Sequence, residues 1–342
     1  REIVKPAVDY ARSGIVLNRL QAYIFSVVEP IYLSTAGARS VYGSQQANDS
    51  LVVEGEHFRQ PGLADALELL AIEGERLFYQ GEMGSELVAA CQSGGGYLQQ
   101  ADLDAYTVVK RAPLDYQYRS AGILTNPPPS SGGSLIRFAH ALLEPHDPGE
   151  FGSARHLVLM AEVMRQTNLA RMENRLARGG NEGDILQQET ISRFRSALAG
   201  HPVNSRGTTH ISVVDAGDNA ASLTLSNGEG SGYVLPGTGV MVNNMLGEED
   251  LNPGGFHRWD TGARVSSMMA PTLAIDGQRV IATGSGGSNR LRTAILQTLT
   301  NLYDFGMDVR EAVESPRLHV EKDLLSIEPG FSGSAVEQVC AG

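Results

Sequence analysis

The sequence predicts a layered α/β fold in which helices cover a β-rich block, and three observations lead to this prediction. Up to about residue 200, apolar residues recur mostly at helical spacing, as at Leu63, Leu67, Leu70 and Leu77. After Thr208 the chain changes to short β-branched runs broken by Gly, Asn and Asp. Two more helical stretches follow these runs, and helices on one side of a β-rich block are typical of a layered α/β domain.

The predicted elements follow in order from the N-terminus. Helices are expected at 5–14, 63–79, 81–96, from about 134 to 143 and at 154–180, with a short strand before the prolines at 127–129. The polar stretch 178–206 predicts a helix and a surface loop. Strands are expected at 210–215, 220–226, 239–244, 271–276, 279–284 and 324–331, and helices at 290–305 and 307–317.

The composition narrows the class of protein. A chain of 342 residues can form one large domain or two. Its net charge of −12 argues against a phosphate-binding surface, so nucleic acid is not an expected partner. No apolar run approaches the roughly 18–20 residues that a membrane helix needs. The histidines and the two cysteines, Cys91 and Cys340, lack the spacing of a metal site, so we expect neither a metal nor a cofactor.

The junction Gly207-Thr208-Thr209-His210 raises a chemical question, because a polar cluster opens the most strand-like run of the chain. One reading is a loop that enters a strand. The other is that the bond before Thr208 breaks, so that Thr208 becomes a chain end whose own α-amine, with a pKa near ~7.7–8.0, can act as the base for its hydroxyl. Gly207 suits such a cleavage, since it adds no side chain and tolerates unusual backbone angles.

Five motifs favour the second reading. They are "GTTHISVVDAGDNAASLTLSNGEGSGY", "GVMVNNM", "RVSSMMAPT", "ATGSGGSNR" and "PPPSSGG". In order and approximate spacing they resemble the γ-glutamyltransferase family over nearly the whole chain. The resemblance implies an N-terminal-nucleophile hydrolase with an αββα sandwich, cut from one precursor into a large subunit (here 1–207) and a small subunit (208–342) that form one intertwined domain. It also implies γ-glutamyl substrates such as glutathione, water or amino-acid and peptide acceptors, and a periplasmic or secreted location.

By the same resemblance, Thr208 is the nucleophile, freed by cleavage after Gly207. A downstream hydroxyl supports it, and either Thr224 or Ser226 takes this place. Asn227 lies where a substrate-binding asparagine is expected.

The resemblance assigns the oxyanion hole to Gly286 and Gly287, with Ser288 as the alternative to one of them. Backbone N–H donors are needed where the oxyanion forms, and the loss of one typically lowers the rate by ~10²–10³. Glycines expose such amides without obstruction.

The remaining assignments concern the amino-acid end of the substrate. Ser266 and Ser267 match a serine pair that holds the α-carboxylate, and Glu248 or Glu249 stands where the family binds the α-amino group. The stretch 127–133 is expected to brace or line the site.

Two departures from the family pattern lead us to expect a fragment. The chain begins after the region that carries a carboxylate-binding arginine, and it stops before the last strands of the small subunit. A related cephalosporin (glutaryl) acylase and a protein that never matures are the alternative functions.

Overall fold

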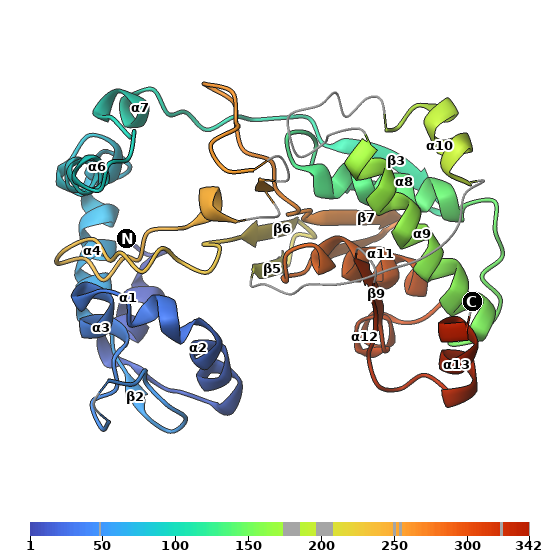
Figure 1. The fold of residues 1–342 in the computed structure, drawn as a ribbon, viewed down its shortest axis with the longest axis horizontal. Helices are drawn as coiled ribbons and strands as arrows, with labels where there is room; N and C mark the ends of the chain where they lie inside the picture. The colour runs from blue at the N-terminus through green and yellow to red at the C-terminus, as the bar shows by residue number, and fades with distance from the viewer. Residues whose placement is uncertain are drawn as a thin grey trace. The chain divides into compact units, whose positions relative to one another are not determined.

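The computed structural model describes residues 1–47, 49–173, 185–195, 208–248, 251–252, 255–321 and 324–341 (Figure 1). These residues form two compact units. The first unit contains Arg1–Lys110 and Glu229–Asn244, and the second contains Arg111–Gly228 and Met245–Gly342. Each unit takes residues from both sides of the junction at 207/208, and the two subunits stay a prediction about how the chain is processed.

The first unit is mainly helical. Its elements are α1 (Lys5–Ser13), β1 (Ile15–Val16), α2 (Arg19–Tyr32), α3 (Ala36–Tyr42), β2 (His57–Phe58), α4 (Pro61–Glu73), α5 (Arg76–Tyr79), α6 (Glu82–Ser93) and α7 (Gln100–Asp104). A capping box between Asn18 and Gln21 begins α2. Aromatic rings of α2, α3 and β2 pack edge to face or stacked and form the core of this unit, as in the contact of Phe25 with Phe58.

The prediction of a strand at 239–244 is wrong. Residues 231–242 form an irregular hairpin with a single isolated bridge, between Val234 and Met241. Glycines at 230, 232, 237 and 239 adopt positive φ angles, and this backbone geometry interrupts a regular ladder.

The second unit contains the β-rich block. Its strands are β3 (Leu114–Tyr118), β4 (Ala121–Thr125), β5 (Thr209–Val214), β6 (Ala220–Leu225), β7 (Thr272–Asp276), β8 (Arg279–Thr283), β9 (Leu318–Glu321) and β10 (Leu324–Ile327). Its helices are α8 (Ser131–Leu143), α9 (Ala154–Glu173), α10 (Gln188–Arg195), η2 (Met245–Gly247), α11 (Arg290–Tyr303), α12 (Val309–Glu314) and α13 (Gly333–Ala341).

An antiparallel sheet of order β3-β4-β7-β8 forms the centre of the second unit. Helices α8 and α11 lie against it (Figure 1), and their residues Ile136 and Ile295 belong to the same buried hydrophobic cluster as Ile123 of β4. Each such side chain contributes roughly 1.5–3 kcal/mol when buried. Helix α9 packs on α8, and the β5–β6 hairpin contacts β7 and β8, where the Ser222 hydroxyl donates to the Thr283 carbonyl at 2.9 Å. The predicted layered α/β fold is confirmed.

Several elements differ from expectation: the helix expected at 63–79 is two helices, α4 and α5, and the strand expected at 324–331 ends at Ile327. Helix α8 begins at Ser131, three residues before the expected start, so that Gly132 and Gly133 lie in its first turn. A Cβ at Gly132 would collide with the Met268 carbonyl and one at Gly133 with the Asn126 carbonyl, which explains why glycine occupies both positions. Strand β9 was not expected: its four residues alternate apolar and polar types, but the run is short and lies directly after the Ser-Pro-Arg stretch at 315–317, and all four residues are buried.

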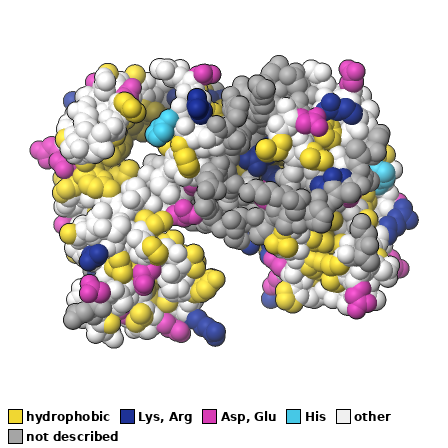
Figure 2. All heavy atoms as spheres, in the orientation of Figure 1, with side chains coloured by type: hydrophobic (Ala, Val, Ile, Leu, Met, Phe, Trp, Pro, Cys, Tyr) yellow, Lys and Arg dark blue, Asp and Glu magenta, His cyan; other side chains and the backbone are white. Residues whose placement is uncertain are grey.

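Acidic and basic side chains are interspersed over the face drawn in Figure 2. Among the residues that the structure describes, no helix combines the length and apolarity needed to cross a bilayer. Within the same residues, no group of three His, Cys, Asp or Glu could hold a metal ion. Cys91 and Cys340 are free thiols.

Candidate active site

The register of the strands gathers the predicted residues at one place. Thr208 precedes β5 and Ser226 follows β6, and the first residue of β5 pairs with the last residue of β6. In the same way, the first residue of β7, Thr272, pairs with the last residue of β8, Thr283. The segments that carry Thr208, Ser226, Ser267 and the glycine loop therefore lie near strand ends, where side chains can converge, whereas Glu248 follows η2.

Five of the predicted residues line one small cavity of about 30 Å³ in the second unit. They are Thr208, Ser226, Glu248, Ser267 and Ser288. The cavity has room for one or two water molecules. Its apolar lining was not anticipated from the sequence and consists of Met245, Leu251, Met268, Met269 and Leu291.

The structure distinguishes between the two candidate hydroxyls, Thr224 and Ser226. The Thr224 hydroxyl lies 2.9 Å from Nδ1 of His210 on the paired strand, and Thr224 does not line the cavity. Ser226 lines the cavity, and its hydroxyl accepts a hydrogen bond from the Gly228 amide at 3.1 Å. Asn227 is exposed and is not among the lining residues.

Sequence reasoning left His210 without a role. Its Nε2 lies 2.9 Å from the Ser212 hydroxyl, and its ring lies against Gly284, where a Cβ would collide with it. Burial lowers the pKa of His210, which favours the neutral ring. Polar residues at alternating positions of β5 and β6, among otherwise apolar neighbours, were the signal for this cluster.

The two predicted serines, Ser266 and Ser267, also have different surroundings. Ser267 lines the cavity, whereas Ser266 is buried and its hydroxyl donates to the Ser131 hydroxyl at 3.3 Å. Of the two predicted glutamates, Glu248 is buried at the cavity, and Glu249 lies outside the described residues, as does Gly207. Glu248 is the one ionisable side chain among the described residues that line the cavity.

The proline-serine stretch braces this region. The Ser130 hydroxyl donates to the Met269 carbonyl at 2.6 Å, and the Ser131 amide donates to the Ser267 carbonyl at 2.9 Å. These bonds fix the backbone on both sides of Met268, and hence the direction of the Ser267 side chain.

The glycine loop adjoins Thr208, and its Ser288 lines the cavity, whereas Gly286 and Gly287 are not among the lining residues. A Cβ at Gly286 would lie 2.8 Å from the carbonyl carbon of Thr208 and closer still to its oxygen, so the two backbones are in direct contact. Gly287 and Ser288 follow with φ angles of 110° and 51°, and α11 begins at Arg290. Because the amides at a helix N-terminus carry partial positive charge, this loop suits a developing oxyanion.

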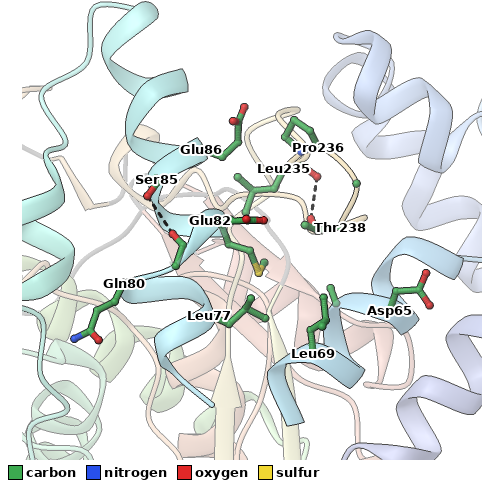
Figure 3. A pocket seen from close by; sticks show the side chains of 14 residues that line it. Asp65, Leu69, Leu77, Gln80, Glu82, Ser85, Glu86, Leu235, Pro236 and Thr238 are labelled. Atoms are coloured by element: carbon green, nitrogen blue, oxygen red, sulfur yellow. Dashed lines mark hydrogen bonds between the residues drawn. The ribbon is translucent and has the colours of Figure 1, made fainter. Parts of the chain in front are cut away.

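A larger cavity of about 840 Å³ lies in the first unit, between α4, α6 and the turn at 235–238 (Figure 3). Its hydroxyls bond to their own backbone: Ser85 donates to the Gly81 carbonyl at 3.1 Å and Thr238 to the Leu235 carbonyl at 2.9 Å. Its Asp65 pairs with Arg12 at 2.6 Å. None of the predicted site residues lines it.

Comparison with known proteins reveals relatives along the whole chain. The family model described as gamma-glutamyltranspeptidase matches residues 1–341. The glutathione hydrolase proenzyme of Escherichia coli (strain K12) is 31% identical, over 97% of this chain and 63% of its own length. The acylase ACY 1 proenzyme of Pseudomonas sp. (strain V22) is 29% identical, over 99% of this chain and 64% of its own length. The chain thus spans less than two thirds of these curated relatives.

Among solved structures, cephalosporin acylase from Bacillus halodurans matches with a TM-score of 0.85 at 21% identity, over 98% of this chain and 65% of that one. This likeness confirms the predicted fold class, a layered α+β fold. Because the family model matches nearly every residue, this chain belongs to the γ-glutamyltranspeptidase family.

Proposed function

We propose that the protein cleaves itself between Gly207 and Thr208 and then transfers or hydrolyses γ-glutamyl groups through an ester on Thr208. The observation that supports this best is the position of Thr208. It contacts Gly286 through its backbone and shares a cavity with Ser226, Ser267 and Glu248.

The self-cleavage consumes one water molecule. The Thr208 hydroxyl attacks the Gly207 carbonyl and gives up its proton, and the amide C–N bond breaks as the nitrogen of Thr208 becomes an amine. The resulting ester is hydrolysed, which leaves a carboxylate on Gly207 and regenerates the Thr208 hydroxyl. The cavity has room for a water molecule beside Thr208.

Turnover repeats the same chemistry on a substrate. The free α-amine of Thr208 accepts the hydroxyl proton as the oxygen attacks the γ-carbonyl, and the loop 286–288 stabilises the oxyanion. Collapse releases the leaving amine, which takes up the proton, and forms the γ-glutamyl ester. Water or the amine of an amino acid or peptide then attacks this ester and restores Thr208.

Glu248 favours a γ-glutamyl group over the glutaryl group of an acylase. Its carboxylate can pair with the α-ammonium that γ-glutamyl compounds carry and glutaryl compounds lack. The acylase alternative is supported by the apolar lining and by the acylase relatives. Of the two serines, Ser267 is the better candidate for a carboxylate contact, because it lines the cavity, whereas Ser266 is buried and does not.

The test uses the complete gene product. We expect two chains on a denaturing gel, the smaller beginning Thr-Thr-His, and release of chromophore from a γ-glutamyl anilide in preference to a glutaryl anilide. Thr208→Ala should remain one chain and release none. Thr209→Ala is the matched control, because Thr209 is an exposed neighbouring hydroxyl, and it should mature normally.

Normal maturation of Thr208→Ala would exclude the proposed nucleophile. Preference for the glutaryl anilide would assign the site to the acylase alternative. An intact wild-type chain without turnover would favour a protein that never matures.

A further inference from the structure

A buried polar cluster lies directly behind the loop 286–288. Asn289 follows the loop and is only 2% exposed. Its side-chain oxygen accepts from Nη1 of Arg171 on α9 at 3.1 Å, and its side-chain nitrogen donates to Oε1 of Glu321 on β9 at 2.6 Å. Because a cation faces the oxygen and a carboxylate faces the nitrogen, the amide has a single satisfied orientation.

The second carboxylate oxygen of Glu321 also has a partner. Its Oε2 lies 3.3 Å from Nε2 of His319, whose Nδ1 lies 2.8 Å from the Thr293 hydroxyl on α11. Burial opposes ionisation, but the bond to His319 and the charges of Arg292 and Arg171 hold the pKa of Glu321 below its usual value. Helix α11, helix α9 and strand β9 therefore meet at the side chain of Asn289.

The loop needs such an anchor. Ser288 has a φ of 51°, a left-handed conformation that costs a non-glycine residue about 1–3 kcal/mol and persists only when its surroundings enforce it. Gly287 precedes it with a φ of 110°. Between the contact of Gly286 with Thr208 and the clamp on Asn289, the chain has only these two residues to complete its bend.

We propose that Asn289, clamped between Arg171 and Glu321, is a positioning residue that keeps the loop 286–288 in the conformation that faces Thr208. This inference rests on the proposed function, because it acts through the loop to which that function assigns the oxyanion. Neither Asn289 nor Glu321 lines the cavity.

Three variants of the complete protein test the clamp. Asn289→Asp keeps an oxygen for Arg171 but sets a second carboxylate against Glu321. We expect faster amide exchange in a peptide covering 284–291 and a kcat at least ~10-fold lower, with KM changed less than ~3-fold. The double variant Asn289→Asp/Glu321→Gln restores a donor opposite the new carboxylate, and it should recover both readouts to within ~3-fold of wild type.

If Asn289→Asp does not fold, Asn289→Ser tests the clamp instead, because it shortens the side chain without adding a charge. It should show the same faster exchange and lower kcat. Asn301→Asp is the matched control: Asn301 is equally buried on α11, and its side chain donates to the Ala312 carbonyl at 3.1 Å, away from the loop. It should lower stability while leaving loop exchange and kcat per folded molecule unchanged.

The outcomes separate this inference from the proposed function. Unchanged loop exchange and kcat in the Asn289 variants, no recovery in the double variant, or equal losses in Asn301→Asp would each overturn the positioning role. A wild-type protein that hydrolyses neither anilide would contradict the proposed function instead. Amide exchange of 284–291 would still decide the clamp, because that measurement needs no turnover.

Discussion

Replacing Gly286 by alanine tests the contact on which the proposed chemistry depends. The new Cβ would lie 2.8 Å from the carbonyl carbon of Thr208, whereas carbon atoms that do not share bonds sit ~3.5–4.0 Å apart. One of the two backbones must therefore move by roughly 0.7 Å or more. The atom that blocks the methyl group is backbone, so no side-chain rotation relieves the clash.

A displacement of this size matters more for catalysis than for folding. A misplacement of ~1 Å can cost ~10²-fold in rate, which corresponds to about 2.7 kcal/mol of transition-state stabilisation. We expect Gly286→Ala to slow the appearance of the small chain and to lower kcat/KM on a γ-glutamyl anilide by ~30–100-fold. The φ of Gly286 is outside the left-handed region, so alanine is compatible with that angle, and any fall in melting temperature should come from the displaced backbone alone.

The matched control is Gly333→Ala. Gly333 begins α13, its added Cβ meets no atom within 4 Å, and its φ is also outside the left-handed region. This variant should mature and turn over like wild type. If Gly286→Ala matured and turned over within ~3-fold of the control, the packing of the glycine loop on Thr208 could not carry the role given to it.

Three further predictions address other features of the second unit. Ser226→Ala should lower turnover of a γ-glutamyl anilide by ~10²-fold, whereas Thr224→Val, which removes a hydroxyl outside the cavity, should change kcat by less than ~5-fold. Ser130→Ala should destabilise the protein by about 0.5–1.5 kcal/mol in urea unfolding, because the partly buried Met269 carbonyl loses a 2.6 Å hydrogen bond and keeps a longer one, of 3.3 Å, from Asn126. Burial lowers the pKa of His156 to about 4, so the unfolded chain binds more protons between pH ~6.5 and that value, and stability falls as the pH drops through this window. His156→Gln should reduce this loss, by up to about 1.4 kcal/mol per pH unit, in urea titrations compared at pH ~7 and ~5.

The sequence predicted backbone features better than the direction of single side chains. Strands such as β6 follow the local alternation that the sequence displays directly. The leucine spacing at 63–79 predicted helix correctly, but the stretch forms two helices, α4 and α5, and Leu70 is exposed. Adjacent or alternating residues are harder to separate, because a shift of one position along a strand reverses the face of every side chain. This is why Ser266 could not be told from Ser267 until the bonds to the 127–133 stretch were visible.

Long-range polar pairs could not be predicted from the sequence for a different reason. Asn289 meets Arg171 at 118 positions' distance along the chain and Glu321 at 32, and no local pattern marks such partners. A histidine after a double threonine was visible in the sequence, but the contact of His210 with Gly284 depends on how the hairpin lies against β8. Tertiary packing decides both contacts.

The geometry divides the candidate residues into two groups with different expected effects on maturation. Self-cleavage and turnover both develop an oxyanion beside Thr208, so Gly286 and Ser226 would serve both reactions. The acyl group in self-cleavage is the carbonyl of a glycine, which has neither an α-ammonium nor a free carboxylate to bind. Glu248 and Ser267 would therefore contribute only to turnover, since their proposed partners exist only on the γ-glutamyl substrate. A loss of turnover with normal maturation in Glu248 and Ser267 variants, against a loss of both in Gly286 and Ser226 variants, is the pattern that one shared nucleophile requires.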